Sequence, residues 1–224
     1  MIKDRNKKLN DIKTTIRTKA SDINRLYRIG PDGRFGPDLY FYKRTLSLRF
    51  SAKNLNAFVE DDHNLEMVYA TLVAWDMNSR GAKIKYFDDF KRSVLTCLLK
   101  LSNLEALEVQ RGSIDQKLDC IADIYENLHV MKTGGRLVSN SKLLHFLLPR
   151  LCIPMDSKNT LKYFYGYEAE SGVKYMEIMQ LGLEVIESPE DEWDRYLDDG
   201  WNATVPKLID NAVLLLAGNS LSNS

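Results

Sequence analysis

The stretch from Thr133 to Phe164, TGGRLVSNSKLLHFLLPRLCIPMDSKNTLKYF, concentrates features that core packing alone does not explain. Gly134 and Gly135 allow a sharp turn, because glycine adopts positive φ angles without steric cost. Three small polar residues of the kind that cap helix N-termini come next: Ser139, Asn140 and Ser141. We therefore predict that a short apolar helix follows over residues 142–148.

Pro149 should end this helix, since proline lacks an amide hydrogen and disfavours the α conformation in the residue before it. The segment then holds three ionisable residues among apolar neighbours: Lys142, His145 and Asp156. Apolar surroundings shift pKa values, and shifted groups gather at functional sites. The opposing interpretation is structural, with Asp156 as a helix cap, His145 as a hydrogen-bonded core residue and Lys142 as a solvated side chain.

The composition is that of an ordinary globular chain. The 224 residues are 44% hydrophobic, and 31 basic residues balance 31 acidic ones. Zero net charge neither favours nor excludes a polyanionic partner, which only a local patch would bind. Three widely spaced cysteines without a Cys-x-x-Cys pair predict reduced, mostly buried thiols in a cytoplasmic protein. No apolar run reaches the length of a membrane span, so no membrane partner is expected.

Apolar residues recur at helical spacing along most of the chain. Helices are predicted over these ranges: 1–29, 62–80, 86–101, 113–129, 172–187, a short acidic one from 189, and 204–218. Residues 38–50 fit a helix or a strand, and helical neighbours favour the helix. The predicted fold class is all-α, a compact array of about eight to ten helices in one domain, residues 1–224. Two lobes with a cleft would divide it into residues 1–30 with 135–224, and 36–134.

Aromatic and polar residues that could contact a ligand lie in the first half of the chain. Tyr40 and Tyr42 adjoin two basic residues, a combination that stacks bases and holds phosphates, although such aromatics more often belong to a core. Trp75, Asn78 and Arg80 lie near the predicted end of a helix, where side chains reach outward.

Motifs of metal and cofactor chemistry are missing from the sequence. It has no phosphate-binding loop, no dinucleotide-binding glycine pattern and no His-Glu-x-x-His helix. The three histidines are far apart in sequence, which does not support a metal site: His63, His129 and His145. We predict no metal and no cofactor.

Two segments, YATLVAWDMNSRGAKI (69–84) and LVSNSKLLHFLLPRLCIPMD (137–156), with PDLYFY (37–42) before them, resemble a family of uncharacterised microbial proteins. The resemblance covers roughly residues 36–165 and implies no particular activity.

Ile153-Pro154-Met155-Asp156 is also similar to a motif of the helix-hairpin-helix DNA glycosylase superfamily, an apolar-Pro-apolar-Asp tetrapeptide. Lys142 lies near the position at which some members carry a lysine, and the segment LVSNS (137–141) stands in place of their glycine hairpin. The resemblance implies that Asp156 is a catalytic carboxylate, that Lys142 is an amine nucleophile and that DNA is the partner.

Two hypotheses follow. In the first, the protein is a nucleic-acid enzyme or an inactive relative, with Lys142, His145 and Asp156 on one wall of a cleft. The other wall and the approach to it would use these residues: Tyr40, Tyr42, Trp75, Asn78, Arg80, Ser139, Asn140 and Ser141. In the second, the protein is a non-enzymatic interaction protein, such as a homodimer, that associates through exposed apolar residues near Trp193 and Trp201.

Overall fold

The computed structural model describes residues 1–29, 37–78, 83–188 and 192–221. In these residues it contains eleven α-helices and no β-strand; the only pairing of extended backbone is an isolated antiparallel bridge between Ile84 and Met131. The helices are α1 (Arg5–Ile29), α2 (Pro37–Ser51), α3 (Leu55–Glu60), α4 (Asp62–Ala74), α5 (Phe87–Thr96), α6 (Leu98–Val109), α7 (Ile114–Asn127), α8 (Leu137–Leu147), α9 (Lys162–Tyr165), α10 (Gly172–Ile186) and α11 (Val205–Leu221). A π-helical turn, η1 (Ser157–Leu161), precedes α9, and a 3-10 turn, η2 (Trp193–Tyr196), precedes α11. The all-α prediction is confirmed.

Side-chain caps explain where several helices begin. Asp61 accepts a hydrogen bond from the His63 amide at the start of α4. Ser113 and Gln116 form a reciprocal capping box that starts α7. The helical prediction for residues 38–50 is confirmed by α2.

Several predicted boundaries were wrong, including the end of the helix expected over residues 62–80, since α4 ends at Ala74. The single helix expected over residues 86–101 is two helices, because the chain leaves the helical path at Cys97 and re-enters it in α6. Helix α8 begins at Leu137, so Ser139, Asn140 and Ser141 lie within its first turns and do not cap it. The short acidic helix expected from residue 189 is the 3-10 turn η2, and residues 189–191 themselves lie outside the described residues.

The paired glycines also behave differently from the prediction. Gly134 lies in a bend and Gly135 follows it, but neither has a positive φ. Among the described glycines that conformation occurs at Gly166, with φ of 79°, where the chain turns out of α9. Pro149 follows α8 as predicted, since the helix ends at Leu147.

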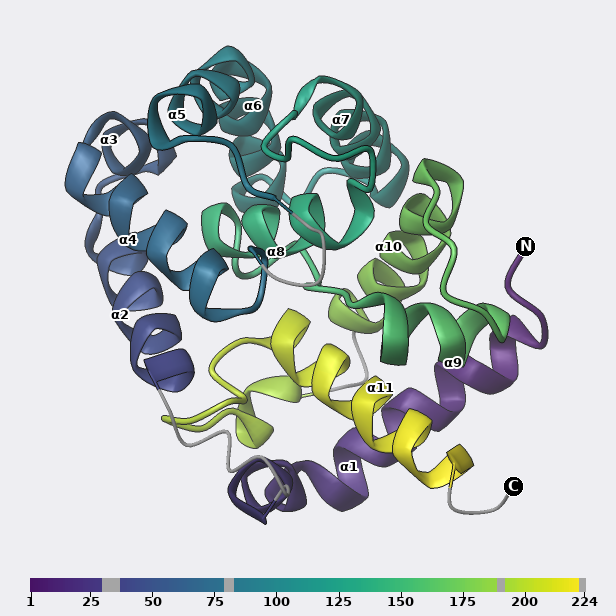
Figure 1. Ribbon diagram of the computed structural model, residues 1–224. Helices are drawn as coiled ribbons and strands as arrows, with labels where there is room; N and C mark the ends of the chain where they lie inside the picture. The colour runs from purple at the N-terminus through teal and green to yellow at the C-terminus, as the bar shows by residue number, and fades with distance from the viewer. Residues whose placement is uncertain (30–36, 79–82, 189–191, 222–224) are drawn as a thin grey trace.

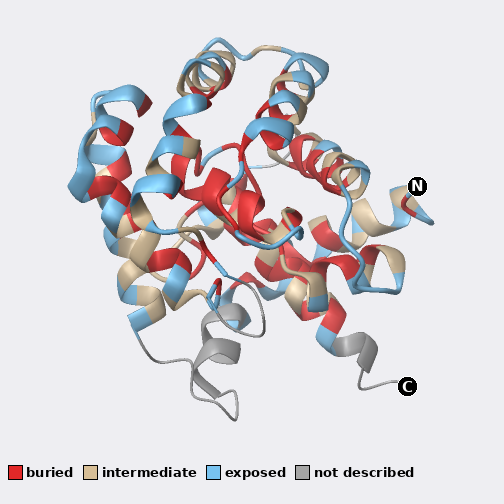
Figure 2. Ribbon diagram, turned by 45° about the horizontal axis from the view of Figure 1, so that its top comes forward, coloured by how far each residue is buried: buried red, intermediate tan, exposed pale blue. Residues whose placement is uncertain are grey.

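Helix α8 lies at the centre of the molecule. Figure 1 shows α2 to α7 in an arc on one side of it, with α1, α9, α10 and α11 on the other. Of its residues only Val138 and Lys142 are not fully buried, and Figure 2 shows the buried residues concentrated around this central segment. The helix therefore connects the two groups, and Lys142 is its one charged residue that reaches towards solvent.

The core includes two residues that were expected on a contact surface. Trp193 and Trp201 are buried, with 4% and 6% of their surface exposed, so the predicted interaction surface around them is wrong. The indole N–H of Trp193 donates to the Val185 carbonyl at 2.7 Å, which accounts for its buried polar atom. Cys97 and Cys152 are buried thiols and Cys120 is half-buried, and none forms a disulfide, as predicted. Within the described ranges, no helix combines the length and apolar character needed to cross a bilayer.

Candidate functional site

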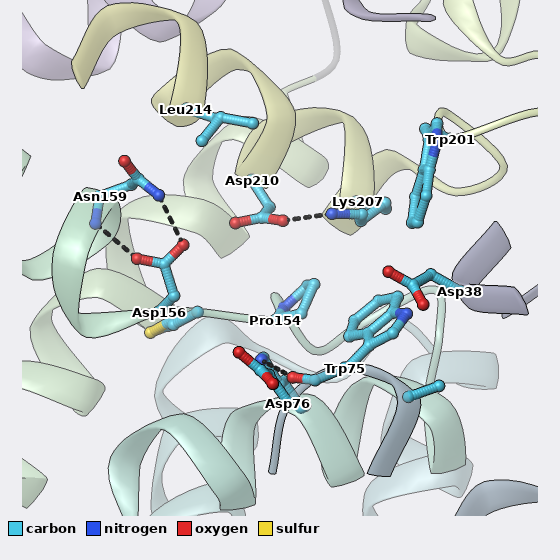
Figure 3. A pocket seen from close by; sticks show the side chains of 13 residues that line it. Asp38, Trp75, Asp76, Pro154, Asp156, Asn159, Trp201, Lys207, Asp210 and Leu214 are labelled. Carbon is cyan, nitrogen blue, oxygen red and sulfur yellow. Dashed lines mark hydrogen bonds and ion pairs between the residues drawn. The ribbon is translucent and has the colours of Figure 1, made fainter. Parts of the chain in front are cut away.

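A cavity of about 310 Å³ lies where the two groups of helices meet (Figure 3). Its walls come from the start of α2, the end of α4, α8, the segment before η1, and α11. The lining residues are Asp38, Ala74, Trp75, Asp76, Lys142, Pro154, Met155, Asp156, Asn159, Trp201, Lys207, Asp210 and Leu214. A volume of this size is at the lower end of the range for small-molecule pockets.

Lys142 reaches the cavity from the centre of α8. Its ammonium donates a hydrogen bond to the Trp75 carbonyl oxygen at 2.9 Å, which uses one of three N–H donors. Burial lowers the pKa of Lys142, and the Lys207 charge lowers it further. Nearby carboxylates, Asp156 foremost and then Asp210, act in the opposite direction and favour the charged amine. The sequence prediction of an amine with a perturbed pKa at this position is supported on these grounds.

Asp156 caps a helical turn, as the structural interpretation predicted, and it also lines the cavity. Its carboxylate accepts hydrogen bonds from the Asn159 amide and, at 2.9 Å, from the Asn159 side chain, so Asp156 caps η1. The same side chain lines the cavity that Lys142 enters. A residue that caps a helix is held in one orientation, so the cap fixes the carboxylate at the cavity wall.

A second lysine and aspartate face the cavity from α11. The Lys207 ammonium lies 2.6 Å from the Asp210 carboxylate, and Figure 3 shows the pair opposite Asp156. Burial raises the pKa of Asp210, while Lys207 lowers it. The sequence analysis missed this pair. Its spacing of three residues on a helix is a signal for an ion pair, but nothing in the sequence places α11 next to α8.

Aromatic rings form part of the wall. The ring centroids of Trp75 and Trp201 are 6.3 Å apart, and the Lys207 ammonium lies 5.2 Å from the Trp75 ring and 5.6 Å from the Trp201 ring. Behind them, Tyr42 stacks on Trp201 at 5.8 Å. The Trp75 indole N–H is buried and has no hydrogen-bond partner, which native structures rarely leave unexplained.

His145 and Tyr42 do not line the cavity. His145 is fully buried, with its Nδ1 2.9 Å from the Cys152 carbonyl oxygen and its Nε2 3.3 Å from the Tyr42 hydroxyl. A carbonyl only accepts, so Nδ1 carries the proton and Nε2 accepts from Tyr42. Burial lowers the pKa of His145 to about 3. The structural interpretation of His145 as a hydrogen-bonded core histidine is therefore correct, and its predicted place on the cleft wall is wrong.

Three other predicted residues lie away from the cavity, and a fourth falls outside the described residues. Tyr40 is 66% exposed and contacts Phe41 edge to face, and Asn78 is exposed after the end of α4. Neither lines the cavity. Arg80 lies outside the described residues. Ser139 is buried, and its hydroxyl donates to the Arg136 carbonyl at 3.2 Å.

Asn140 and Ser141 support the site from behind. Asn140 donates to the Leu128 carbonyl at 3.0 Å and holds the end of α7 against α8. The Ser141 hydroxyl accepts from the Met155 amide at 3.1 Å, immediately before Asp156. The Ser141 bond positions the segment that carries Asp156, and neither buried side chain is open to a ligand.

The arrangement offers amine and carboxylate chemistry. Two lysines and four aspartates line the cavity, so their formal charges make it acidic. No group of three or more His, Cys, Asp or Glu side chains suited to a metal ion occurs in the part of the chain that the structure describes. No protein-family model, curated protein or solved structure matches the chain, so the site is interpreted from its own geometry.

Proposed function

We propose that the cavity accepts a base extruded from DNA and that Lys142 attacks the sugar carbon that carries the base. This is chemistry of the helix-hairpin-helix glycosylase type, and it extends the resemblance of the Ile153–Asp156 motif to the function of the chain. The observation that carries the proposal is the presence of Lys142, with a lowered pKa, in the same cavity as Asp156.

An amine attacks carbon only when it is unprotonated. A desolvated lysine holds more of the neutral form near pH 7 than a solvated one does, which makes Lys142 the strongest nucleophile candidate in the cavity. In the proposed step the amine nitrogen forms a bond to C1′, the C1′–base bond breaks, and the base leaves with the electron pair. The amine proton passes to a proton acceptor of the protein near Lys142.

The carboxylates of the cavity would stabilise the positive charge that develops in this step. Positive charge grows on the sugar as the base departs, and an ionised carboxylate held at the cavity wall stabilises it without reorganising. Asp156 is held by its cap to η1. Asp210, whose pKa is raised by burial, is the candidate to accept the amine proton.

The aromatic wall fits a flat ring. Enzymes that act on an extruded base commonly stack it between aromatic or apolar side chains. Three residues that line the cavity supply such surfaces: Trp75, Pro154 and Trp201. The cavity volume of about 310 Å³ suits a single base with part of its sugar and not a larger duplex segment.

Borohydride trapping tests the proposal directly. Attack of Lys142 on C1′ leads to an imine with the opened sugar, and borohydride reduces that imine to a stable protein–DNA adduct. Incubation with duplexes that contain alkylated, oxidised, deaminated or abasic nucleotides should give the adduct with the unaltered protein and none with Lys142→Gln. Lys53→Gln, which changes an exposed lysine far along the chain, is the matched control. Absence of product and adduct with every duplex would remove the proposal.

A second candidate is a non-enzymatic protein that associates with another copy of itself. Leu99 is 76% exposed at the start of α6, and Leu95, four residues earlier near the end of α5, is 36% exposed. Exposed apolar side chains that form a patch are typical of contact surfaces. Sedimentation would test this: a dimer that Leu99→Asp dissociates supports it, and a monomer at high concentration excludes it.

A further inference from the structure

A second hollow, of about 540 Å³, lies between the beginning of the chain, α9 and the start of α10. Its charge is opposite to that of the first cavity. Four lysines line it, Lys3, Lys8, Lys162 and Lys174, against the two carboxylates Asp4 and Glu177. We call this hollow the lysine–tyrosine groove, because three tyrosines also line it: Tyr163, Tyr165 and Tyr167.

Two of the four lysines make contacts within the protein. The Lys8 ammonium donates to the Tyr163 carbonyl and lies 4.1 Å from the Tyr163 ring. The Lys174 ammonium donates to the Ala169 carbonyl and lies 3.9 Å from the Tyr167 ring. These contacts hold the groove in shape. Lys3 and Lys162 are exposed, and their ammonium groups have no ion pair within the described ranges, so both can bind an external anion.

The turn after α9 places a ring at the edge of the groove. Gly166 has φ of 79°, a left-handed conformation that lets the chain reverse between Tyr165 and Tyr167. The two ring centroids are 6.4 Å apart, and the Tyr165 hydroxyl is held by Glu177 at 2.7 Å. Tyr167 is 55% exposed, so one of its faces is open to a stacking partner while Lys174 covers another part of the ring.

A continuous stretch of chain joins the groove to the first cavity. Asp156 at the N-terminal end of η1 lines the cavity, and Lys162 at the start of α9 lines the groove. Five residues, Ser157–Leu161, lie between them, so the two positions are at most about 9 Å apart along the axis at the α-helical rise. The acidic cavity repels phosphates, whereas the groove attracts them.

We propose that the lysine–tyrosine groove binds the sugar–phosphate backbone of a single DNA strand, with Lys3 and Lys162 on phosphates and Tyr167 stacked on a base. Basic grooves with stacking aromatics are the general device for binding single strands without reading their sequence. The inference rests on the proposed function for its choice of nucleic acid as the ligand, and it assigns the phosphate contacts that the cavity cannot make.

Fluorescence anisotropy of a labelled 20-nucleotide single strand of DNA, titrated with protein between 0.05 and 0.3 M salt, tests the groove. In the double variant Lys3→Gln/Lys162→Gln, loss of two phosphate contacts should weaken binding about 25-fold at 0.1 M salt and reduce the salt slope by about 1.4. The control double variant Lys19→Gln/Lys53→Gln removes two exposed lysines elsewhere and should bind as the unaltered protein does.

Two matched tyrosine variants test the stacking contact. Tyr167→Ala should weaken binding about tenfold. Tyr86→Ala is its match, because Tyr86 is 74% exposed and also lies under a lysine, with the Lys132 ammonium 3.5 Å from its ring. It should leave binding unchanged.

The outcomes separate the groove from the proposed function. Strand binding that depends on Lys3, Lys162 and Tyr167 supports the groove even if borohydride traps no adduct. Equal binding by the Lys3→Gln/Lys162→Gln variant and the unaltered protein overturns the groove, even if Lys142 forms the adduct. Failure of the unaltered protein to bind the strand at 0.05 M salt also overturns it.

Discussion

The Lys207 ammonium lies 2.6 Å from the Asp210 carboxylate, in a site where 5% and 16% of the two side chains are exposed. The pair lies on α11, but it forms one wall of a cavity whose other charged groups come from α2, the end of α4, α8 and the segment before η1. Because the surroundings exclude most water, each charge stabilises the other. The pair therefore ties the stability of the fold to the electrostatics of the cavity.

Removing one member of the pair should destabilise the protein strongly. Asp210→Asn removes the carboxylate that lies 2.6 Å from the buried Lys207 ammonium, and we expect a loss of about 3–5 kcal/mol in the free energy of unfolding, measured with urea. The comparison is Asp123→Asn, which breaks the more exposed Lys100–Asp123 pair, 34% and 55% exposed, and should cost at most about 1 kcal/mol. Equal losses in the two variants would show that Lys207 is compensated by other means.

The two roles of Asp156 can be separated by substitution. Asparagine is also a good N-cap, so Asp156→Asn should keep stability near that of the unaltered protein, whereas Asp156→Ala should lose about 1 kcal/mol. Only the charge is lost in Asp156→Asn. Since that charge raises the pKa of Lys142, its removal should lower this pKa further.

The rate at which Lys142 reacts with an acylating reagent, followed by mass spectrometry against pH, measures the effect. Its midpoint should move to lower pH in Asp156→Asn, because a lower pKa yields neutral amine sooner as pH rises. A second variant, Asp61→Asn, alters a capping aspartate that the cavity does not include and should leave the midpoint in place. A shift to higher pH in Asp156→Asn would contradict the assignment.

The central part of the site could be predicted because its residues are close in sequence. Only the second half of α8 and one proline-bounded segment separate Lys142 from Asp156. The predicted end of one helix and the start of the next therefore place both residues in the same region. The residues on α11 could not be predicted, because no local pattern shows that a helix more than 50 residues later closes the cavity. Trp201 was assigned to the surface for the same reason, although it is a wall of the cavity.

The errors in helix boundaries have local causes. Apolar spacing continues through Cys97, where α5 ends and α6 begins, so periodicity alone did not show the break. At α8, three good capping residues follow the true start, and tertiary bonds recruit two of them: Ser141 binds the Met155 amide and Asn140 binds the Leu128 carbonyl. Buried polar bonds between elements overrode the capping preference.

Buried His145 should make stability depend on pH. Its pKa is about 3 in the folded protein and about 6.5 when unfolded, so the unfolded state binds more protons between these values and stability falls as pH falls through that window. The contribution is roughly 4–5 kcal/mol between pH 7 and pH 3. Urea unfolding from pH 4 to 7 should show a flatter dependence in His145→Asn than in the unaltered protein. Exposed His63 is the control, and His63→Asn should keep the original slope.

Gly182 sets the distance between α10 and the segment that carries Pro154 and Asp156. A Cβ atom at this position would lie 1.8 Å from Cδ1 and 3.2 Å from Cγ1 of Ile153, which is buried. Gly182→Ala should therefore cost about 1–3 kcal/mol, because the core has no room for the added methyl group. If Ile153 is the obstacle, Ile153→Val should rescue it, since valine lacks the Cδ1 atom that the new methyl meets.

The double variant Gly182→Ala/Ile153→Val should then be more stable than Gly182→Ala alone, although Ile153→Val by itself loses about 1 kcal/mol. Gly218→Ala provides the opposite control, because nothing lies within 4 Å of an added Cβ on that part of α11, and alanine there should stabilise the helix by about 0.4–1 kcal/mol. The opposite result would be a double variant whose loss in the free energy of unfolding equals the sum of the two single losses. It would mean that contacts other than the one between Gly182 and Ile153 position the segment before Asp156.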